Sequence, residues 1–255
     1  MQSQCLTWQG TVGGLAALAV LATCGLISFA DPPPAKNDPP QPLSEETVQA
    51  WKKAGAHVGW VSVNPDGGYF PEFYSEKRGR AGEVPAFGFS VWTAGVLPKL
   101  PVPGAAFGLS LGRAKVTDAG LKELTGLKSL QSLNLVGAKV TDAGLKELAG
   151  LKSLQSLDLG GTKVTDAGLK ELAGIKSLQS LNLYNTRVTD AGLKELAGLK
   201  SLQSLDLDST RVTDAGLKEL AGLKSLQALS LSGTQVTDAG VAELRKALPG
   251  CQIRR

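Results

Sequence analysis

Hydrophobic residues recur along the second half of the chain with two alternating spacings. Leu130, Leu133 and Leu135 follow the spacing LxxLxL, in which apolar and polar positions alternate as in a short strand with one buried face. Residues 141–148, with the sequence TDAGLKEL, favour a short helix because Thr141 is a good N-cap and two leucines share one face. Each unit therefore predicts one strand, one turn and one short helix.

This unit recurs at a fixed interval. The sequence Val-Thr-Asp-Ala-Gly occurs six times at a spacing of 24 residues, beginning at Val116, Val140, Val164, Val188, Val212 and Val236. Such a period indicates a solenoid or a related repeat architecture, and it shifts the expected function from catalysis toward binding. One unit is too small to bury its own leucines, so we expect stacked copies to share a continuous core.

Geometry sets the direction in which the stack bends. Parallel strands stack about 4.8 Å apart, whereas packed helices need about 8–10 Å between their axes. We therefore expect a curved α/β solenoid with a parallel sheet on its concave face and short helices on its convex face. Gly144 and its equivalents are expected to let each helix lie close to the sheet, because glycine has no side chain.

The repeat resembles the leucine-rich-repeat family. Leu154, Leu157, Leu159 and Val164 match the family spacing LxxLxLxxNxL, and the TDAGLKEL half is similar to ribonuclease-inhibitor-like and F-box-associated repeats and to exported bacterial members. The resemblance covers residues 106–255, and 84–105 weakly. The chain departs from it at the Asn position, which holds Ala114, Ala138, Thr162, Thr186, Thr210 and Thr234. In the family this Asn bonds to the backbone along a ladder, so we expect the first turns, which have alanine, to be less well tied.

The N-terminal leader has the composition of an export signal. Residues 1–30 carry no Asp, Glu, Lys or Arg, and residues 11–30 are mostly apolar. We interpret them as a signal peptide cleaved after Ala30, and two alternatives stay open: an uncleaved anchor that attaches residues 11–30 to a membrane, or a lipoprotein modified at Cys24. The protein is therefore expected to be exported, and to be periplasmic, on the cell surface or anchored to a membrane.

Two further parts precede the solenoid. Residues 31–43 hold six prolines and predict a stiff spacer. Residues 44–105 predict an N-terminal α+β cap with a degenerate first repeat, in which Ser44 caps a helix, residues 57–63 form a strand and residues 64–68 form a turn. Phe87, Phe89 and Val91 alternate like a strand that pairs with the first full repeat. The alternative is that 44–105 is a small, separate binding unit.

The solenoid covers residues 106–255, and its C-terminal end is predicted to form a cap that closes the stack. The last helix lengthens, Pro249-Gly250 ends it, and Cys251-Gln252-Ile253 is expected to add an edge strand. Cys251 is expected to be packed in this cap, and the two terminal arginines to make the edge less prone to pairing with another chain.

Signatures of catalysis or of metal binding are missing from the sequence. His57 is the only histidine, and Cys251 is the only cysteine outside the leader, so neither a zinc site nor a nucleophile with a histidine base is indicated. No GxGxxG or GxxxxGK[ST] motif occurs. The aspartates that recur every 24 residues each follow a threonine at a helix start, so capping explains them better than calcium binding does. We expect no enzymatic activity, no cofactor and no metal.

The charge pattern does not indicate nucleic-acid binding. The net charge is +4 over 255 residues, and the lysines recur evenly, as Lys146, Lys152 and their equivalents, which is typical of a solvated face. No aromatic stacking platform accompanies them. Nucleic acid is therefore not an expected partner, and the protein is expected to be a monomer that binds another protein.

Variation among the repeats indicates where that partner binds. The first sixteen residues of the five full copies are nearly identical, whereas the positions at the strand ends differ in every copy. Strand side chains alternate, so the residues between the leucines face the concave surface. Tyr184 stands out as the only aromatic residue after Phe107, with a large and rigid contact area. The predicted partner-binding residues are Asn134, Asp158, Asn182, Tyr184, Asn185, Asp206, Asp208 and Ser209, with Arg187 and Arg211 on the rim.

The resulting hypothesis is a non-catalytic binding scaffold of the cell envelope. Its acidic and aromatic centre, with a basic rim, suits a protein partner that carries a basic or polar segment. Two alternatives stay open: envelope glycan or peptidoglycan binding, and an adaptor for a ubiquitin-ligase-like complex, which an export leader would contradict. The variation itself also has a second interpretation, in which the helix positions are held constant by helix propensity while the strands are free to drift.

Overall fold

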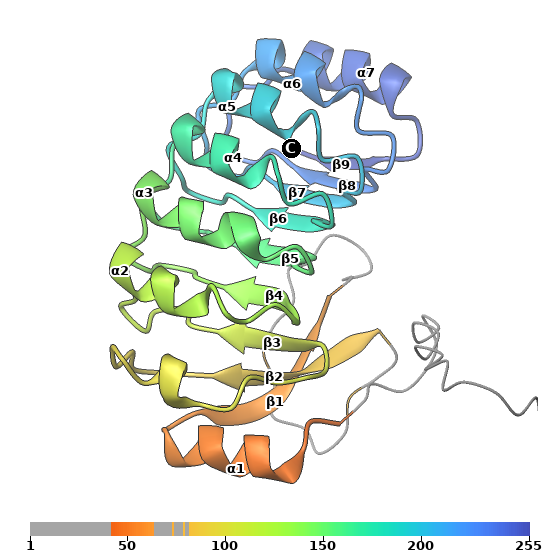
Figure 1. Ribbon diagram of the computed structural model, residues 1–255. Helices are drawn as coiled ribbons and strands as arrows, with labels where there is room; N and C mark the ends of the chain where they lie inside the picture. Colours follow the sequence, from red (N-terminus) through yellow and green to blue (C-terminus); the bar gives the residue numbers. More distant parts are fainter. Residues whose placement is uncertain (1–41, 64–72, 74–78, 80–81) are drawn as a thin grey trace, which may run out of the picture. The chain divides into compact units, whose positions relative to one another are not determined.

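A computed structural model describes residues 42–63, 73, 79 and 82–255. The leader, most of the spacer and the turn predicted at residues 64–68 lie outside the described residues. Within the described part, one nine-stranded sheet runs in the order β1 to β9, with short helices along one side of it (Figure 1). Among these residues, none of the helices has the length and apolar character that crossing a membrane would require.

The elements alternate along the chain as the repeat predicts. The strands are β1 (His57–Ser62), β2 (Glu83–Gly88), β3 (Phe107–Ser110), β4 (Leu130–Asn134), β5 (Ser156–Asp158), β6 (Ser180–Asn182), β7 (Ser204–Asp206), β8 (Ala228–Ser230) and β9 (Gln252–Arg254). The helices are α1 (Glu45–Lys53), η1 (Leu97–Lys99), α2 (Asp118–Leu121), η2 (Lys122–Leu124), α3 (Asp142–Leu145), η3 (Lys146–Gly150), α4 (Asp166–Leu172), α5 (Asp190–Leu196), α6 (Asp214–Leu220) and α7 (Asp238–Ala247).

The predicted α/β solenoid is confirmed. Strand β1 pairs antiparallel with β2, and every later neighbour in the sheet pairs parallel. The central strand leucines lie in register across the sheet and are buried, which gives the continuous core expected from the stacked units: Leu133, Leu157, Leu181, Leu205 and Leu229.

The N-terminal elements close one end of this core. The helix predicted after Ser44 is confirmed as α1, and the Ser44 Oγ accepts a hydrogen bond from the Thr47 N–H. Trp51 is fully buried, stacks on Phe87 with 4.2 Å between ring centroids, and meets Phe107 edge-on at 6.1 Å. Since Phe107 belongs to the first full repeat, α1 and β2 pack onto the same leucine core.

Strand β2 pairs with β3 in parallel, as a first repeat should. The predicted strand from Phe87 to Val91 was wrong at its far end, however. Strand β2 ends at Gly88, and Val91 is 74% exposed, because the chain turns away after Phe89 has reached the core.

The C-terminal end also matches the prediction. Helix α7 has 10 residues, and β9 adds to the sheet after Pro249-Gly250. Arg245 from α7 donates a hydrogen bond to the Ile253 carbonyl on β9, at 3.2 Å. Arg255 forms an ion pair with Asp238, and Cys251 is buried. Arginine side chains thus satisfy acceptors at the last strand and the last helix.

The recurring aspartates do more than the capping predicted for them. From Thr141 onward the threonine side chains cap their helices, as the Thr141 Oγ1 does by accepting from the Ala143 N–H at 3.3 Å, whereas the Thr117 side chain makes no cap hydrogen bond. Each aspartate except the last, Asp238, in contrast, reaches the next repeat. The Thr141 N–H donates to Asp118 Oδ1 at 2.8 Å, and the Thr141 hydroxyl donates to Asp118 Oδ2 at 2.7 Å. The same pair of bonds joins Asp142 to Thr165, Asp166 to Thr189, Asp190 to Thr213 and Asp214 to Thr237. We call this series the aspartate ladder.

The recurring glycine serves this ladder, and its predicted role against the sheet was wrong. A Cβ on Gly168 would overlap Asp142 Oδ1 and would lie 2.9 Å from Leu145 Cδ1, both in the preceding helix. The same overlap with the preceding aspartate recurs at Gly144, Gly192, Gly216 and Gly240. The glycine is therefore needed for the approach of one helix to the next, because only a hydrogen atom fits beside the ladder carboxylate.

The threonines at the family's Asn position bond within their own repeat. The Thr162 hydroxyl donates to the Leu159 carbonyl at 2.7 Å, and Thr186, Thr210 and Thr234 repeat this bond. Alanine at 114 and 138 has no hydroxyl, so the first turns lack this bond, as expected. Unlike the family Asn, however, these threonines do not tie one repeat to the next through that bond.

Candidate binding surface

The concave face of the sheet consists of rows of residues that cross the strands in register. One row is occupied mainly by serine: Gly108, Ser132, Ser156, Ser180, Ser204, Ala228 and Gln252. The next, which we call the Asx row, runs through Ser110, Asn134, Asp158, Asn182, Asp206, Ser230 and Arg254. Both rows alternate with the buried leucines, so their side chains face away from the helices.

Four residues of the Asx row that were predicted to bind a partner form turns at the ends of their strands. Each accepts, through its Oδ1, a hydrogen bond from the backbone N–H two residues further on, which makes an Asx turn. The distances are 3.0 Å from Val136 to Asn134, 2.9 Å from Gly160 to Asp158, 2.7 Å from Tyr184 to Asn182 and 2.8 Å from Asp208 to Asp206. The variation between Asn and Asp in this row therefore stays within the residue types that form such a turn.

The centre of the Asx row is also poorly accessible. Asp158 is 7% exposed and Asn182 is 9% exposed, whereas Asp206 is half-buried. Burial raises the pKa of Asp158 from 3.8 to about 6, against the opposing hydrogen bonds from Gly160 and Asn182. Burial also raises the pKa of Asp206, and the nearby Arg254 partly offsets this rise. Asp158 and Asn182 therefore offer little side-chain surface for contact with another molecule.

Asn185 and Ser209 occupy a turn position that requires a left-handed backbone. Their φ values are 51° and 58°. The equivalent residues are Arg113 in the first repeat, with a φ of 61°, and glycines in three others, with φ values of 65° at Gly137, 67° at Gly161 and 69° at Gly233. Asparagine tolerates this conformation better than serine does. Both side chains are exposed. Backbone geometry thus limits what this position can hold, although it leaves the two side chains free to make contacts.

The position just before that turn neither forms an Asx turn with its side chain nor requires a left-handed backbone. We call it the strand-end row, and it holds Val136, Gly160, Tyr184, Asp208 and Ser232. Tyr184 is 48% exposed, one of three large apolar side chains exposed in the described part of the chain. Its neighbour Asp208 is half-buried and accepts a hydrogen bond from the Ser232 N–H at 2.6 Å. An aromatic residue and a carboxylate therefore occupy consecutive positions of the strand-end row.

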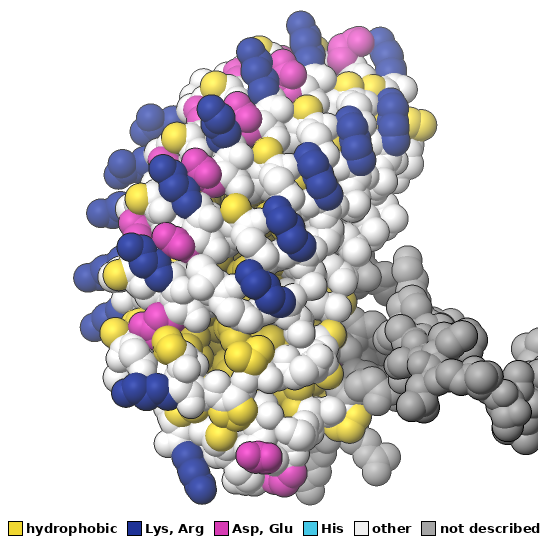
Figure 2. All heavy atoms as spheres, in the orientation of Figure 1, with side chains coloured by type: hydrophobic (Ala, Val, Ile, Leu, Met, Phe, Trp, Pro, Cys, Tyr) yellow, Lys and Arg dark blue, Asp and Glu magenta, His cyan; other side chains and the backbone are white. Residues whose placement is uncertain are grey.

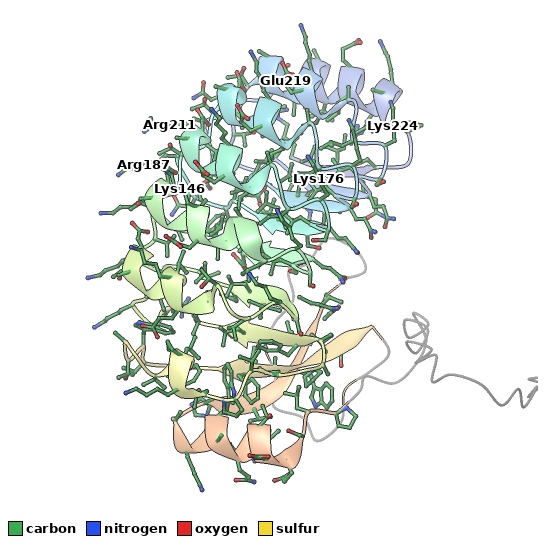
Figure 3. All side chains as sticks on the ribbon, in the orientation of Figure 1. Lys146, Lys176, Arg187, Arg211, Glu219 and Lys224 are labelled. Carbon is green, nitrogen blue, oxygen red and sulfur yellow. The ribbon has the colours of Figure 1, made fainter. Side chains whose placement is uncertain are left out.

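Arg187 and Arg211, predicted for the rim, lie in the turns that follow β6 and β7. Arg187 and Arg211 occupy the same turn in consecutive repeats, and their backbone N–H groups donate to Val164 and Val188 of the preceding repeats. Figure 3 shows them on the side of the stack away from Lys176 and Lys224. Both are exposed. They therefore line the same edge of the stack as the strand-end row.

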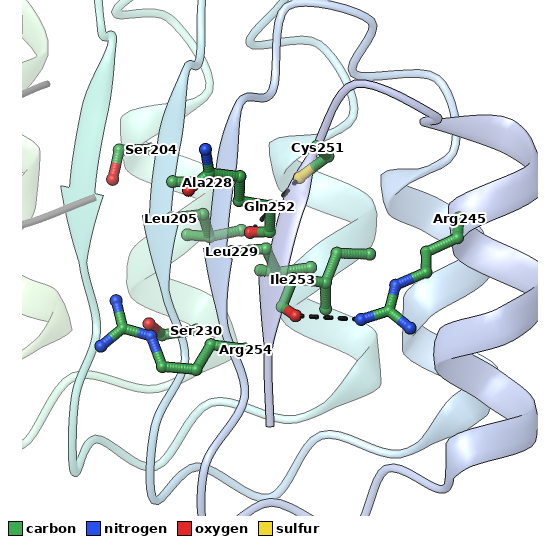
Figure 4. A pocket seen from close by; sticks show the side chains of 10 residues that line it. All are labelled: Ser204, Leu205, Ala228, Leu229, Ser230, Arg245, Cys251, Gln252, Ile253 and Arg254. Carbon is green, nitrogen blue, oxygen red and sulfur yellow. Dashed lines mark hydrogen bonds between the residues drawn. The ribbon is translucent and has the colours of Figure 1, made fainter. Parts of the chain in front are cut away.

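One concave residue was missed by sequence reasoning. Arg254 occupies the Asx row on β9, two strands from Asp206, and is exposed. Figure 4 shows its side chain beside Ser230. The 24-residue period ends before β9, so the sequence pattern gave no signal for this position. Pairing of β9 with β8 places a basic residue at the end of an otherwise acidic and neutral row.

The described residues do not assemble a catalytic site. Cys251 lines an open hollow of about 370 Å³ beside β7, β8 and β9, and burial raises the pKa of its thiol to about 11, so it stays protonated at neutral pH. His57 is exposed on β1, at the other end of the sheet order, with its Nε2 3.4 Å from the Ser90 Oγ. In the part of the chain that the structure describes, no group of three or more His, Cys, Asp or Glu side chains is arranged to hold a metal ion.

Comparison with known families agrees with this geometry. A family model described as leucine rich repeat matches residues 176–236, and a second leucine-rich-repeat model matches residues 126–149 and 150–173. This part of the chain is an array of leucine-rich repeats. An open parallel sheet with short helices on its convex side is the repeat-based binding scaffold of that family.

Solved structures from two bacteria resemble this leucine-rich-repeat protein. A leucine-rich-repeat protein from Leptospira interrogans is 29% identical, with a TM-score of 0.51, and the match covers 66% of this chain and 40% of that one. Internalin C2 from Listeria monocytogenes is 29% identical, with a TM-score of 0.48 and coverage of 63% and 66%. Another internalin from the same species is 24% identical, with a TM-score of 0.49 and coverage of 58% and 40%.

The matched part spans 40% to 66% of the length of these three proteins. The search of curated proteins found no match.

Proposed function

We propose that this leucine-rich-repeat protein is a non-catalytic scaffold of the cell envelope that binds a protein partner along the strand-end edge of its concave sheet. The observation that carries the proposal is the strand-end row. The side chains of this row do not form the Asx turns that end the strands, and the backbone there is not left-handed. The residues nevertheless differ in every repeat. Tyr184 and Asp208 lie side by side in it.

The contact set differs from the one that sequence variation alone suggested. Tyr184 supplies a large, exposed aromatic surface, which is typical of residues that dominate protein interfaces. Asp208 adds a carboxylate, and Asn185 and Ser209 add exposed polar groups at the next turn. Asp158 and Asn182 accept hydrogen bonds from the backbone of Gly160 and Tyr184. They contribute little direct contact, because their side chains are buried.

Charge suggests the chemistry of the partner. Asp206 and Asp208 lie in neighbouring rows of one repeat, and Arg187 and Arg211 lie along the same edge of the stack. A partner segment with an apolar side chain next to a basic one would place the first on Tyr184 and the second near the two carboxylates. Export, which the leader sequence indicates, would make that partner a component of the envelope.

A paired retrieval experiment tests the proposal. The protein is immobilised and incubated with envelope extract, beside a Tyr184→Ala, Asp208→Ala variant and a control Lys170→Ala, Lys194→Ala variant. We expect a protein that is retained by the wild type and by the control, and that is lost with the strand-end variant. Equal retention by all three would disprove the assignment of the strand-end row. A bound glycan in place of a protein would favour the alternative of glycan recognition.

A further inference from the structure

A second surface lies at the opposite ends of the same strands. We call it the strand-start rim, and it consists of the five segments that join each helix to the next strand. Each segment holds one lysine and neither Asp nor Glu: Lys128 in 125–132, Lys152 in 149–156, Lys176 in 173–180, Lys200 in 197–204 and Lys224 in 221–228. All five lysines are exposed. Figure 2 shows a column of basic side chains along this edge without acidic side chains between them.

Each of these lysines is held in the same way. Its Nζ donates a hydrogen bond to a backbone carbonyl at the helix end of the following repeat. The distances are 3.4 Å from Lys128 to Gly150, 3.1 Å from Lys152 to Gly174, 3.3 Å from Lys176 to Gly198, 3.2 Å from Lys200 to Gly222 and 3.0 Å from Lys224 to Ala247. An ammonium group has three donors, so each lysine retains donors for a ligand while its position is fixed.

The helix lysines make a useful contrast. Lys146, Lys170 and Lys194 also recur once per repeat and are exposed, but each is followed directly by a glutamate. Figure 2 shows acidic side chains beside the basic ones over the helices. The strand-start rim is therefore the surface on which a row of positive charge runs along five repeats without nearby carboxylates.

Neutral polar groups lie next to this row. Each segment carries a serine directly after its lysine and a glutamine two residues later. The Gln179 Nε2 donates to Gln155 Oε1 at 3.4 Å, and the Gln203 Nε2 donates to Gln179 Oε1 at 3.5 Å, so the amides form a line parallel to the lysines. At its C-terminal end the rim opens into a hollow of about 410 Å³ that Gln203, Lys224, Ser225, Gln227, Pro249 and Gly250 line together with three apolar residues.

We propose that the strand-start rim binds an anionic polysaccharide along its length, with one sugar unit in the hollow beside Lys224. A line of fixed cations matches a linear polymer that carries a negative charge at intervals, because each lysine meets a new charge as the chain advances. The amides and hydroxyls beside it match sugar hydroxyl groups. The five segments contain no aromatic residue, which argues against a single-stranded nucleic acid, whose bases would need stacking platforms.

This surface is independent of the proposed concave function. The two lie at opposite ends of the strands, so one protein has room for a protein partner at the strand-end row and a glycan at the strand-start rim. The competing explanation is that the lysines only offset the negative ends of the helices, where they bond. That explanation predicts no binding of a polymer.

Two variants of equal net charge separate these explanations. One replaces Lys152, Lys176 and Lys200 with glutamine, which retains a donor for the carbonyl; the other replaces Lys146, Lys170 and Lys194 with glutamine. Binding is measured to polygalacturonate, to uncharged dextran of the same length and to an oligodeoxythymidine. We expect the wild type to bind polygalacturonate and not dextran. The rim variant should bind about tenfold or more weakly, and the helix variant should stay within about threefold of wild type.

The remaining outcomes would overturn the proposal. No binding of polygalacturonate, or equal losses in the two variants, would show that the rim is not a site. Binding of the oligonucleotide as tightly as the polysaccharide would exclude a glycan site. Thermal unfolding of each variant checks that it is folded, and replacement of the same rim lysines with arginine, which keeps the charge, should restore binding.

Discussion

The helix side and the strand-end side of the stack are held together by hydrogen bonds of different reach. On the helix side, Asp142 accepts two bonds from Thr165, 23 residues further on and in the next repeat. On the strand-end side, Asp158 accepts a bond from Gly160 of its own repeat. A helix-side residue therefore serves two repeats at once, whereas a strand-end side chain mostly serves one. This difference explains why one side stays constant among the copies while the other varies.

Hydrogen bonding also explains part of the sequence variation among the repeats. Helix propensity alone would not fix Asp, Thr and Gly together, but the ladder does, because the carboxylate of one repeat needs the threonine and the glycine of the next. Part of the variation on the other side is structural too, since Asn and Asp alternate in the Asx row. What is left is the strand-end row. Asp208 in this row accepts a hydrogen bond from the Ser232 N–H, but the exposed ring of Tyr184 has no structural explanation, and that is why the proposed function is assigned to this row.

The largest expected effect comes from filling the space beside the ladder. In Gly168→Ala, the new Cβ overlaps Asp142 Oδ1, which also accepts the bond from the Thr165 N–H. Either the carboxylate or the helix has to move, and the two bonds to Thr165 weaken. We expect a loss of about 2–4 kcal/mol in the free energy of unfolding, measured by urea denaturation.

Gly174→Ala in the same repeat is the matched control. A Cβ there would meet only the Lys152 Nζ, at an ordinary 3.5 Å, so the change should cost less than about 0.5 kcal/mol. Adding Asp142→Ala to Gly168→Ala should recover part of the loss, because the overlap is removed. Equal costs for Gly168→Ala and Gly174→Ala would refute the ladder's spacing requirement.

The next effect is expected on the concave side, at Asp158. Its pKa is raised from 3.8 to about 6 by burial, so the folded state holds its proton more tightly than the unfolded state does. This contribution to stability is present below about pH 4 and is lost as the pH rises through about 6. Asp158→Asn keeps the acceptor for the Gly160 N–H and removes the charge. We expect it to raise stability by about 1–3 kcal/mol at pH 8 and to change it little at pH 4.

Asp214, in the ladder, should show the opposite sign. Hydrogen bonds from the Thr237 hydroxyl and N–H lower the pKa of its carboxyl group. Its contribution to stability is therefore present above the unfolded value of 3.8 and is lost as the pH falls through the lowered value. Asp214→Asn should destabilise the protein at pH 7, with a difference that shrinks in acid. If Asp158→Asn and Asp214→Asn shift stability in the same direction at pH 8, the carboxylates on the concave side and on the helix side do not have the opposite pKa shifts that the structure indicates.

Most of the architecture was accessible from the sequence because repetition strengthens weak local signals. The spacing of leucines, the threonine N-caps and the lengthened last helix each identify their elements, and all are confirmed. The partners of the ladder were not accessible. Asp118 lies next to Thr117 in sequence, so capping within one helix was the nearest explanation. Its bond to Thr141 requires knowing how far apart and at what angle two helices stack.

The candidate binding surface was also predictable only in part. Alternation placed Tyr184 correctly on the open side, where it is exposed. The same rule placed Asp158 and Asn182 there too. Alternation predicts the face on which a side chain lies but not how far its neighbours cover it, and these two side chains are buried. Nor does it show that Ser209 needs a left-handed backbone, because serine does not mark that conformation as glycine does. The sequence predicts a solvated face at Lys128 and its equivalents; their alignment in one row, which the proposed glycan site requires, is visible only in the structure.

A smaller effect is expected at the turn that follows the strand-end row. Ser209 has a φ of 58°, where three other repeats have glycine. Ser209→Gly removes the contact between its Cβ and the backbone, and we expect a gain of about 0.5–1 kcal/mol in the free energy of unfolding. Asn185→Gly should gain less, because asparagine tolerates this conformation. A loss of partner binding that accompanies the gain at Ser209 would show that the strained residue is kept for contact, and unchanged binding would show that it is not.

The smallest effect is expected where the ladder ends. Asp238 has no threonine in a following repeat, and Arg255 forms an ion pair with it instead. The Asp238 side chain is 95% exposed, so water and salt screen this pair far more than they screen the bonds inside the ladder. Arg255→Ala should lower stability by less than about 0.5 kcal/mol, and that difference should vanish in 1 M salt. Asp142→Ala should cost more and keep its cost in salt, because it breaks hydrogen bonds between two folded repeats. If the two variants cost the same and respond equally to salt, then charge rather than hydrogen bonding couples the repeats along the helix side.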